Sequence, residues 1–181
     1  MKFPLYWSSG IKLFTESKRR SYEVEYIIRE AGLKDYSSLK PLHKEVHDIH
    51  AEARPDKYKR TEETLDKTYY DELISSSDSK VYIVEDQGEI AGFTILKKTW
   101  PPKWDIKVQA PVVFMHDLGV KDSYRRRGIA RLLFEKAVEF TKECGAVSLE
   151  LGVWEFNQSA IDFYEKMGMT TQARKMEIKI D

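Results

Sequence analysis

A strand, a basic turn and a helix follow one another directly over residues 112–140, and this stretch constrains the fold most. Residues 112–120 are mostly apolar and β-branched, which is typical of a buried strand. From Ile129 onward, apolar side chains recur at the three- and four-residue intervals that put them on one face of a helix. The stretch therefore predicts a buried strand followed by an amphipathic helix, with residues 125–128 as the turn between them.

The basic turn predicts a site for a phosphate or pyrophosphate. The start of a helix leaves backbone N–H groups unpaired, and the aligned peptide dipoles make that end positive. Gly128 and Ala130 are small enough to let an anion approach, while Arg125, Arg126 and Arg127 add full positive charge. A basic surface turn that only caps an ordinary helix would show the same residues, so the pattern by itself leaves both interpretations open.

Two motifs resemble those of the GCN5-related N-acetyltransferase (GNAT) family. Arg125-Arg126-Arg127-Gly128-Ile129-Ala130 resembles the family's Arg/Gln-x-x-Gly-x-Gly/Ala signature, which wraps the pyrophosphate of acetyl-coenzyme A (acetyl-CoA). The second motif is Asn157-x-x-Ala160-x-x-Phe163-Tyr164-Glu165-Lys166-x-Gly168-Met169, with Met169 where Phe is usual. The resemblance covers roughly residues 24–180. It implies an acetyl-CoA-dependent N-acetyltransferase that moves an acetyl group directly to a primary amine. A non-catalytic acetyl-CoA sensor of the same fold is the alternative.

The resemblance also implies residues that bind the coenzyme. Beyond the pyrophosphate turn, the backbone of Leu118, Gly119 and Val120 is expected to pair with the pantetheine arm, at a splay between this strand and the next. Asn157 is expected on the same arm, and its position before a helical stretch also predicts an N-cap. Tyr164 is implied as the general acid beside the coenzyme sulfur, because a phenol of pKa near 10 can protonate a departing thiolate. A core aromatic beside Phe163 is the structural alternative.

Three residues are candidates for the general base that acetyl transfer to an amine requires. Amines are mostly protonated at neutral pH, so a base or a water path must remove a proton before attack. His116 and Asp117 lie on the central strand, and Glu150 lies on the strand expected beside it. Neighbouring residues of a strand point to opposite faces, so we expect only one of His116 and Asp117 to face the site. Each candidate is also explained as an ordinary hydrogen-bonded polar group near a sheet.

Residues on the acceptor side are predicted from two other segments. His43, His47 and His50 share one side of a helix, but no further ligand pattern accompanies them, so a polar helix face is favoured over a metal site. The resemblance implies His50 and Arg54 as acceptor-side residues. The Pro-containing connection of residues 99–111 carries Trp100 and Trp104, which either line the substrate site or stiffen the connection.

Length and charge limit the classes of protein to consider. A chain of 181 residues with 41% hydrophobic residues suits one domain, here residues 21–181, preceded by an extension of unknown role over residues 1–20. Thirty basic residues balance thirty acidic ones, so no net charge draws the chain to nucleic acid or to an anionic membrane. No apolar run comes close to the length of about 18 residues that a transmembrane helix needs.

The cysteine content and the family resemblance predict the cellular location and the partners of the protein. The single Cys144 excludes an internal disulfide and fits a reducing cytosol, so a cytoplasmic location is expected. It is expected to be a half-buried structural thiol. The expected partner is a small-molecule or peptide amine that accepts the acetyl group. Homodimers are common in the family, so the resemblance also implies a second copy of the chain.

The order of elements predicts an α/β fold with a mixed sheet and helices on both faces. The resemblance implies that the sheet is mostly antiparallel, with a splay between the fourth and fifth core strands. Strands are expected at residues 22–30, 81–85, 90–96, 112–120, 147–153 and 176–180. Helices are expected after an Asp35 N-cap, at residues 61–75 with Thr61 as N-cap, from Ile129 to Gly145, and at residues 159–167 before Gly168.

Overall fold

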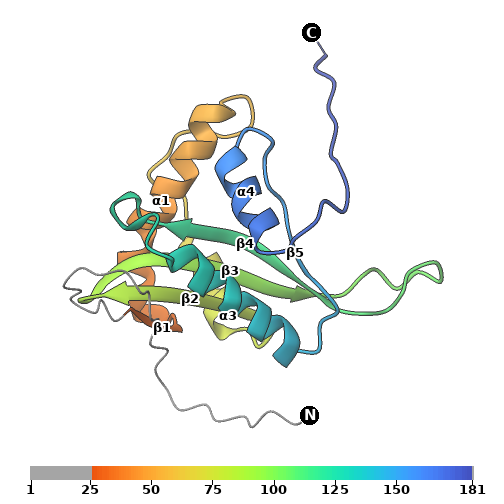
Figure 1. Cartoon of the computed structure of the whole chain (residues 1–181), viewed down its shortest axis with the longest axis horizontal. Coiled ribbons are helices and arrows are strands. Elements are labelled where there is room, and N and C mark those ends of the chain that lie inside the picture. The colour runs from red at the N-terminus through yellow and green to blue at the C-terminus, as the bar shows by residue number, and fades with distance from the viewer. Residues whose placement is uncertain (1–25, 181) are drawn as a thin grey trace.

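One five-stranded mixed sheet, in the order β1-β2-β3-β4-β5, forms the centre of the protein (Figure 1). The computed structural model describes residues 26–180, so the extension at residues 1–20 and residues 22–25 of the first expected strand lie outside the described part. The strands are β1 (Ile27–Glu30), β2 (Ser79–Asp86), β3 (Glu89–Thr99), β4 (Val112–Val120) and β5 (Leu149–Leu151). The pairs β1-β2, β2-β3 and β3-β4 are antiparallel, whereas β5 runs parallel to β4.

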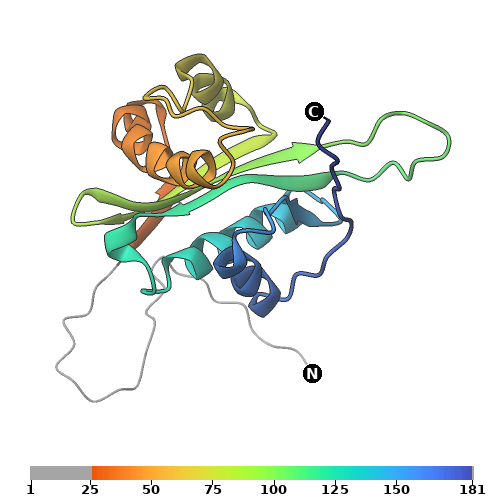
Figure 2. The same cartoon turned by 90° about the horizontal axis from the view of Figure 1, so that it is seen from above.

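Helices cover both faces of the sheet, as the order of elements predicted. They are α1 (Tyr36–Ala53), α2 (Lys67–Ser75), α3 (Ile129–Glu143) and α4 (Gln158–Lys166), with 3-10 turns at Leu33–Asp35 and Asp122–Tyr124. Figure 2 shows α1 and α2 on one side of the sheet, with α3 and α4 on the other. None of the helices within residues 26–180 combines the length and the apolar character that a membrane crossing needs.

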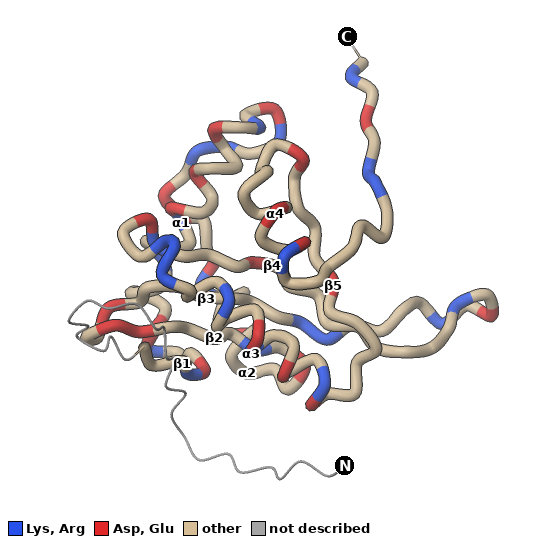
Figure 3. The backbone as a smooth tube through the Cα atoms, in the orientation of Figure 1, with Lys and Arg blue, Asp and Glu red and all other residues tan. Residues whose placement is uncertain are grey.

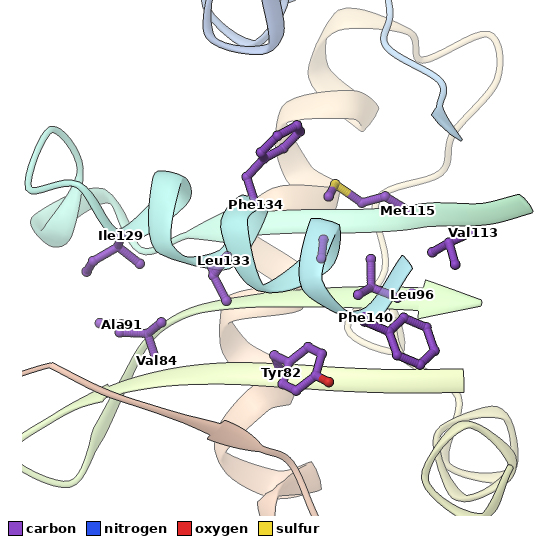
Figure 4. Close-up of a cluster of buried hydrophobic side chains, with 11 residues drawn as sticks. Tyr82, Val84, Ala91, Leu96, Val113, Met115, Ile129, Leu133, Phe134 and Phe140 are labelled. Atoms are coloured by element: carbon purple, nitrogen blue, oxygen red, sulfur yellow. The ribbon is translucent and has the colours of Figure 1, made fainter. Parts of the chain in front are cut away.

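Alternation along the strands divides the buried side chains between two cores. Tyr82 and Val84 of β2 pack with α3 residues such as Leu133 and Phe140 (Figure 4). Val81 and Ile83 point the other way and pack with α1 and α2. This period of two is what a strand buried on both faces requires.

Short-range signals correctly predicted the start of α4 and the end of α3, and they also explain the hairpin turn between β2 and β3. Gln87 and Gly88 form the two-residue turn between β2 and β3, and both have positive φ, as tight hairpins need. Asn157 caps α4 by accepting a hydrogen bond from the Ala160 N–H at 3.2 Å. Gly145 ends α3 with a φ of 66°, directly after the half-buried Cys144.

The sheet opens between β4 and β5. The two strands pair only from Val113 opposite Leu149 to Met115 opposite Leu151. Beyond Met115, β4 continues to Val120 with β3 as its partner on the other edge. This confirms the expected splay, and β5 is shorter than the predicted 147–153 because pairing ends at Leu151.

Two predicted elements were wrong. The second helix begins at Lys67 with Asp66 as N-cap, because the hydroxyl of Thr61 accepts the N–H of Glu63 in a local turn instead of starting a helix. Residues 176–180 form no strand in the described structure, although their polar and apolar residues alternate. A strand needs a neighbouring edge, and no strand within residues 26–180 pairs with this segment.

Candidate functional site

A cleft of about 830 Å³ lies where β4 and β5 separate. One wall is the part of β4 that lacks pairing to β5, which includes Leu118, Gly119 and Val120. The start of α3 closes one end. The lining consists of residues 115–120, 124–126, 128–131 and 151–154, with further residues from α1 and α4 such as Val46, His50, Asn157 and Tyr164.

The turn before α3 leaves the start of that helix open to an anion. Gly128 is the N-cap with a φ of 86°, and no side chain caps the helix. A side chain carbon built on Gly128 would meet no atom within 4 Å, so open space faces the backbone there. Arg126 also has a positive φ of 62°, which is uncommon for a residue other than glycine and is found at ligand clamps. Uncapped N–H groups, the helix dipole and nearby arginines together favour a bound phosphate.

The arginines of the turn differ in where they point. Arg125 and Arg126 line the cleft, and Arg125 is positioned by Asp122 at 3.0 Å and Glu45 at 3.6 Å. Arg127 is not among the lining residues, and its guanidinium lies 5.1 Å from the centre of the Tyr124 ring. Arg131, which the sequence interpretation missed, also lines the cleft. The sequence did carry a signal for Arg131, namely its position in the first helical turn after Gly128.

A β-bulge in β4 brings two candidate bases to the same cleft. Ile95 of β3 pairs with Asp117, and the next residue, Leu96, pairs with Met115. His116 is therefore the extra residue of a bulge, and both His116 and Asp117 line the cleft. The prediction that only one of them faces the site was wrong, because strict alternation holds only for a regular strand.

Asp117 lies on the side of the sheet that α1 covers. Its carboxylate Oδ2 is 4.0 Å from His43 Nε2, and the other ring nitrogen of His43 is 3.0 Å from the Thr64 hydroxyl. Burial lowers the pKa of His43, and the charge of Asp117 opposes that shift. The Thr94 hydroxyl donates to the backbone oxygen of Asp117 at 2.8 Å. Sequence interpretation missed the link between His43 and Asp117, which are 74 positions apart.

Burial shifts the pKa values of His116 and Tyr164 in opposite directions. Burial lowers the pKa of His116, against an opposing effect of Asp117, so the imidazole is neutral at neutral pH. Burial, and secondarily the charge of Asp117, raises the pKa of Tyr164 to about 12. Tyr164 therefore keeps its proton at neutral pH. Its ring packs against Phe163 and Phe134 at centroid distances of 5.2 and 6.3 Å.

Aromatic side chains connect α1 to the loop before α4 at the far end of the cleft. His50 lines the cleft, and its ring lies 5.7 Å from Tyr58 and 6.0 Å from Phe156. Trp154 also lines the cleft and donates its indole N–H to the Tyr58 hydroxyl at 3.1 Å. The guanidinium of Arg54 stacks over Trp154 at 4.7 Å, so Arg54 borders the cleft through this ring.

Besides Arg127 and Arg54, three more predicted site residues do not line the cleft. Glu150 neighbours the cleft residue Leu151 in β5 and accepts hydrogen bonds from Ser148 and Gln172. Trp100 and Trp104 are each 59% exposed in the long connection between β3 and β4, which extends beyond the sheet (Figure 1). Within residues 26–180, no group of three His, Cys, Asp or Glu side chains is arranged to hold a metal ion.

Several known proteins are similar to this chain in sequence or in fold. The model of the Acetyltransferase (GNAT) family matches residues 43–169. An uncharacterized N-acetyltransferase, MJ1207 of Methanocaldococcus jannaschii, is 28% identical over 62% of this chain, which spans about half (49%) of that protein.

Two solved structures extend the comparison. A tetramutant of the BH1408 protein from Bacillus halodurans is 32% identical, with a TM-score of 0.81 over 85% of this chain and 99% of that one. The aminoglycoside N-acetyltransferase AAC(6')-Iy, solved in complex with CoA, has a TM-score of 0.70 over 86% and 95% of the two chains. At 16% identity, that likeness concerns the fold alone. Because the family model and the 32% identical structure each cover most of the sequence, the chain belongs to the acetyltransferase (GNAT) family.

Proposed function

We propose that the protein transfers an acetyl group from acetyl-CoA directly to a primary amine. The observation that carries this proposal is one continuous cleft. It runs from the uncapped start of α3, along the free edge of β4, to His116, Asp117 and Tyr164. Acetyl-CoA would supply a thioester, whose acyl carbon an amine can attack. Family membership supports the same class of reaction.

The residues of the cleft fit a pyrophosphate at one end and an amide-containing chain beside it. The open backbone at Gly128, with Arg125, Arg126 and Arg131, provides N–H donors and positive charge. Backbone groups of residues 118–120 on the unpaired edge of β4 are placed to hydrogen-bond an extended ligand, as a neighbouring strand would. Asn157 lies in the same wall, although its side-chain oxygen already caps α4.

Proton transfers are assigned to residues at the inner end of the cleft. Tyr164, protonated at neutral pH, donates a proton to the departing thiolate. Asp117 attracts the ammonium form of the acceptor and takes its proton, directly or through water. Neutral His116 is the second candidate for this base. Glu150 ranks below both because it does not line the cleft.

The acceptor is proposed to enter between α1 and the loop before α4. His50, Trp154 and Phe156 give this entrance an aromatic character, and Asp117 gives it a negative charge at its base. An amine with an apolar or ring-shaped body fits both features. Arg54 orients Trp154 from behind and is assigned a positioning role.

Calorimetric titration with CoA tests the pyrophosphate site. Arg126→Glu places a negative charge in the cleft, and Gly128→Glu fills the space in front of the helix start. We expect each change to weaken CoA binding by roughly tenfold to a hundredfold or more, the size of one or two lost charge-assisted hydrogen bonds. Arg127→Glu is the matched control because it makes the same charge change outside the cleft lining. Equal losses in all three variants would refute the assigned site.

An amine panel separates the enzyme from the non-catalytic sensor. Wild-type protein is incubated with acetyl-CoA and individual amines, including aminoglycosides, amino acids, polyamines and peptides, and thiol release is followed. Release that depends on one amine class supports transfer and identifies the acceptor. CoA binding without release from any amine favours a sensor, which no feature of the cleft specifically supports.

A further inference from the structure

His43 of α1 lies between the carboxylate of Asp117 and a hydroxyl of the loop before α2. Its Nε2 is 4.0 Å from Oδ2 of Asp117, and its Nδ1 is 3.0 Å from the Thr64 hydroxyl. The side chain of His43 is only 14% exposed, and its ring centre lies 5.9 Å from that of Phe93 in β3. One largely buried ring therefore joins this loop to the inner end of the cleft.

Asp117 depends on His43 for a side-chain partner. Asp117 is the only acidic residue of β4, and this strand contains no Lys or Arg (Figure 3). Within residues 26–180, only His43 brings a basic side chain within 4.0 Å of the Asp117 carboxylate. The Thr94 hydroxyl bonds to the backbone oxygen of Asp117 and not to its side chain. A base must meet its amine in one orientation, so the group that holds its carboxylate matters for the reaction.

The contact with Thr64 favours a proton on the ring nitrogen that faces Asp117. Burial lowers the pKa of His43, Asp117 opposes that shift and His47 adds to it, so the ring is neutral at neutral pH. A neutral imidazole carries one proton, and a hydrogen bond at one nitrogen selects which nitrogen holds it. A Thr64 hydroxyl that donates to Nδ1 leaves the proton on Nε2, directed at Oδ2 of Asp117. The opposite tautomer would turn a lone pair towards a carboxylate, so that two acceptors faced each other.

The loop that carries Thr64 is itself fixed against α1. The next residue, Leu65, is buried, and its backbone oxygen accepts a hydrogen bond from the Tyr36 hydroxyl at 2.9 Å. On the other side of Thr64, Glu63 pairs with Lys40 of α1 at 2.7 Å. These contacts hold the Thr64 hydroxyl where it can orient the His43 ring.

We propose that His43, oriented by Thr64, is a positioning residue that holds the Asp117 carboxylate for its reaction with the acceptor amine. The Nε2–H of His43 attracts Oδ2, which leaves Oδ1 free to meet the ammonium group. At 4.0 Å the pair is longer than a hydrogen bond, and a movement of about 1 Å on acceptor binding would form one. His43 itself does not line the cleft, so it acts through Asp117. This role of His43 rests on the proposed function, in which Asp117 is the base.

Amine-dependent thiol release tests whether His43 acts through Asp117. His43→Phe keeps a ring against Phe93 but removes the N–H. We expect kcat to fall about tenfold to a hundredfold, the size of one hydrogen bond to a charged group, with the KM for acetyl-CoA unchanged. His43→Gln provides an amide N–H in place of Nε2–H and should recover most of this loss. His47→Phe, the same replacement one turn further along α1, is the matched control and should equal wild type.

A double-mutant cycle adds the decisive comparison. In Asp117→Asn protein the carboxylate is already gone, so His43→Phe should have no further effect on kcat. If His43→Phe costs as much in that background as in wild type, His43 does not act through Asp117 and the proposal is overturned. A His43→Gln variant as slow as His43→Phe would overturn it as well, because the N–H would then not be the group that matters.

The ¹⁵N NMR shifts of the imidazole nitrogens test the same geometry without any turnover. The signals of His43 are identified by their absence from the spectrum of His43→Gln. A neutral ring with its proton on Nε2 is expected at neutral pH, whereas a proton on Nδ1 and a bare Nε2 would overturn the proposal. The two proposals can therefore fail separately. Lack of release with every amine refutes the proposed function, while the wrong tautomer refutes the role of His43 even in an active enzyme.

Discussion

Replacing Gly119 with alanine should destabilise the fold through one close contact. Gly119 lies in β4 opposite Phe93, where α1 crosses the sheet. A Cβ at this position would be 2.5 Å from Cε1 of Phe93 and 2.6 Å from Cγ2 of Val46. Real Cβ atoms do not approach other carbons so closely, so the strand, the ring or α1 must shift. Phe93 is fully buried, which leaves its ring little room to move.

The cost follows from what overpacking does in other cores. One added methyl group in a close-packed site costs about 1–3 kcal/mol. A chain of this length loses about 2–4 °C in melting temperature per kcal/mol, so Gly119→Ala should melt about 2–12 °C below wild type. Gly152→Ala is the matched control, because its Cβ would meet no atom within 4 Å and Gly152 also lines the cleft. It should stay within about 0.5 kcal/mol of wild type.

Thermal and urea unfolding, followed by circular dichroism, measure both variants under the same conditions. The urea midpoint should fall for Gly119→Ala with an unchanged slope, because the unfolded surface does not change. If Gly119→Ala and Gly152→Ala unfold together, α1 does not approach β4 as closely as the structure indicates. That result would also mean that contacts with Phe93 and Val46 are not the reason why residue 119 is a glycine.

Two further predictions concern titrating side chains. Tyr164→Phe should lower kcat about a hundredfold, and unchanged turnover would refute the assignment of Tyr164 as the general acid. Because the pKa of Tyr164 is about 12, the wild-type kcat should not change between pH 7 and pH 10 through ionisation of Tyr164. The hydrogen bond to Arg29, which also binds Glu85, lowers the pKa of Asp35 to about 2. The lowered pKa adds about 2 kcal/mol to the free energy of unfolding. This contribution is fully present above the unfolded-state pKa of 3.8 and is lost as the pH falls towards 2. Asp35→Asn should therefore reduce the free energy of unfolding at pH 7 but leave it nearly unchanged near pH 2, as urea titrations at both pH values would show.

Local signals explain which parts of the site could be predicted from the sequence. The turn at residues 125–130 is contiguous, so its charge, its glycine and the following helix can be recognised together. Asn157 and Gly145 were predicted because caps depend on residues only a few positions away. Thr61 shows the limit of such signals, since a hydroxyl can bond a nearby N–H without starting a helix.

Contacts between distant segments explain what could not be predicted. His43 reaches Asp117 only because α1 packs on the sheet at that point. Arg127 and Arg126 are adjacent and chemically identical, yet only Arg126 lines the cleft, because the backbone conformation at each residue decides the direction. Alternation at residues 176–180 indicated a strand, but pairing depends on an edge that the sequence does not specify.

The β-bulge at His116 links the two halves of the proposed site. It comes one residue after Met115, the last residue of β4 that pairs with β5. An extra residue bends a strand and increases its twist, which turns β4 away from β5 at the point where the cleft begins. The same residue shifts the alternation, so that His116 and Asp117 both reach the cleft. One irregularity in β4 therefore accounts both for the free edge that would hold acetyl-CoA and for the polar groups that would deprotonate the amine.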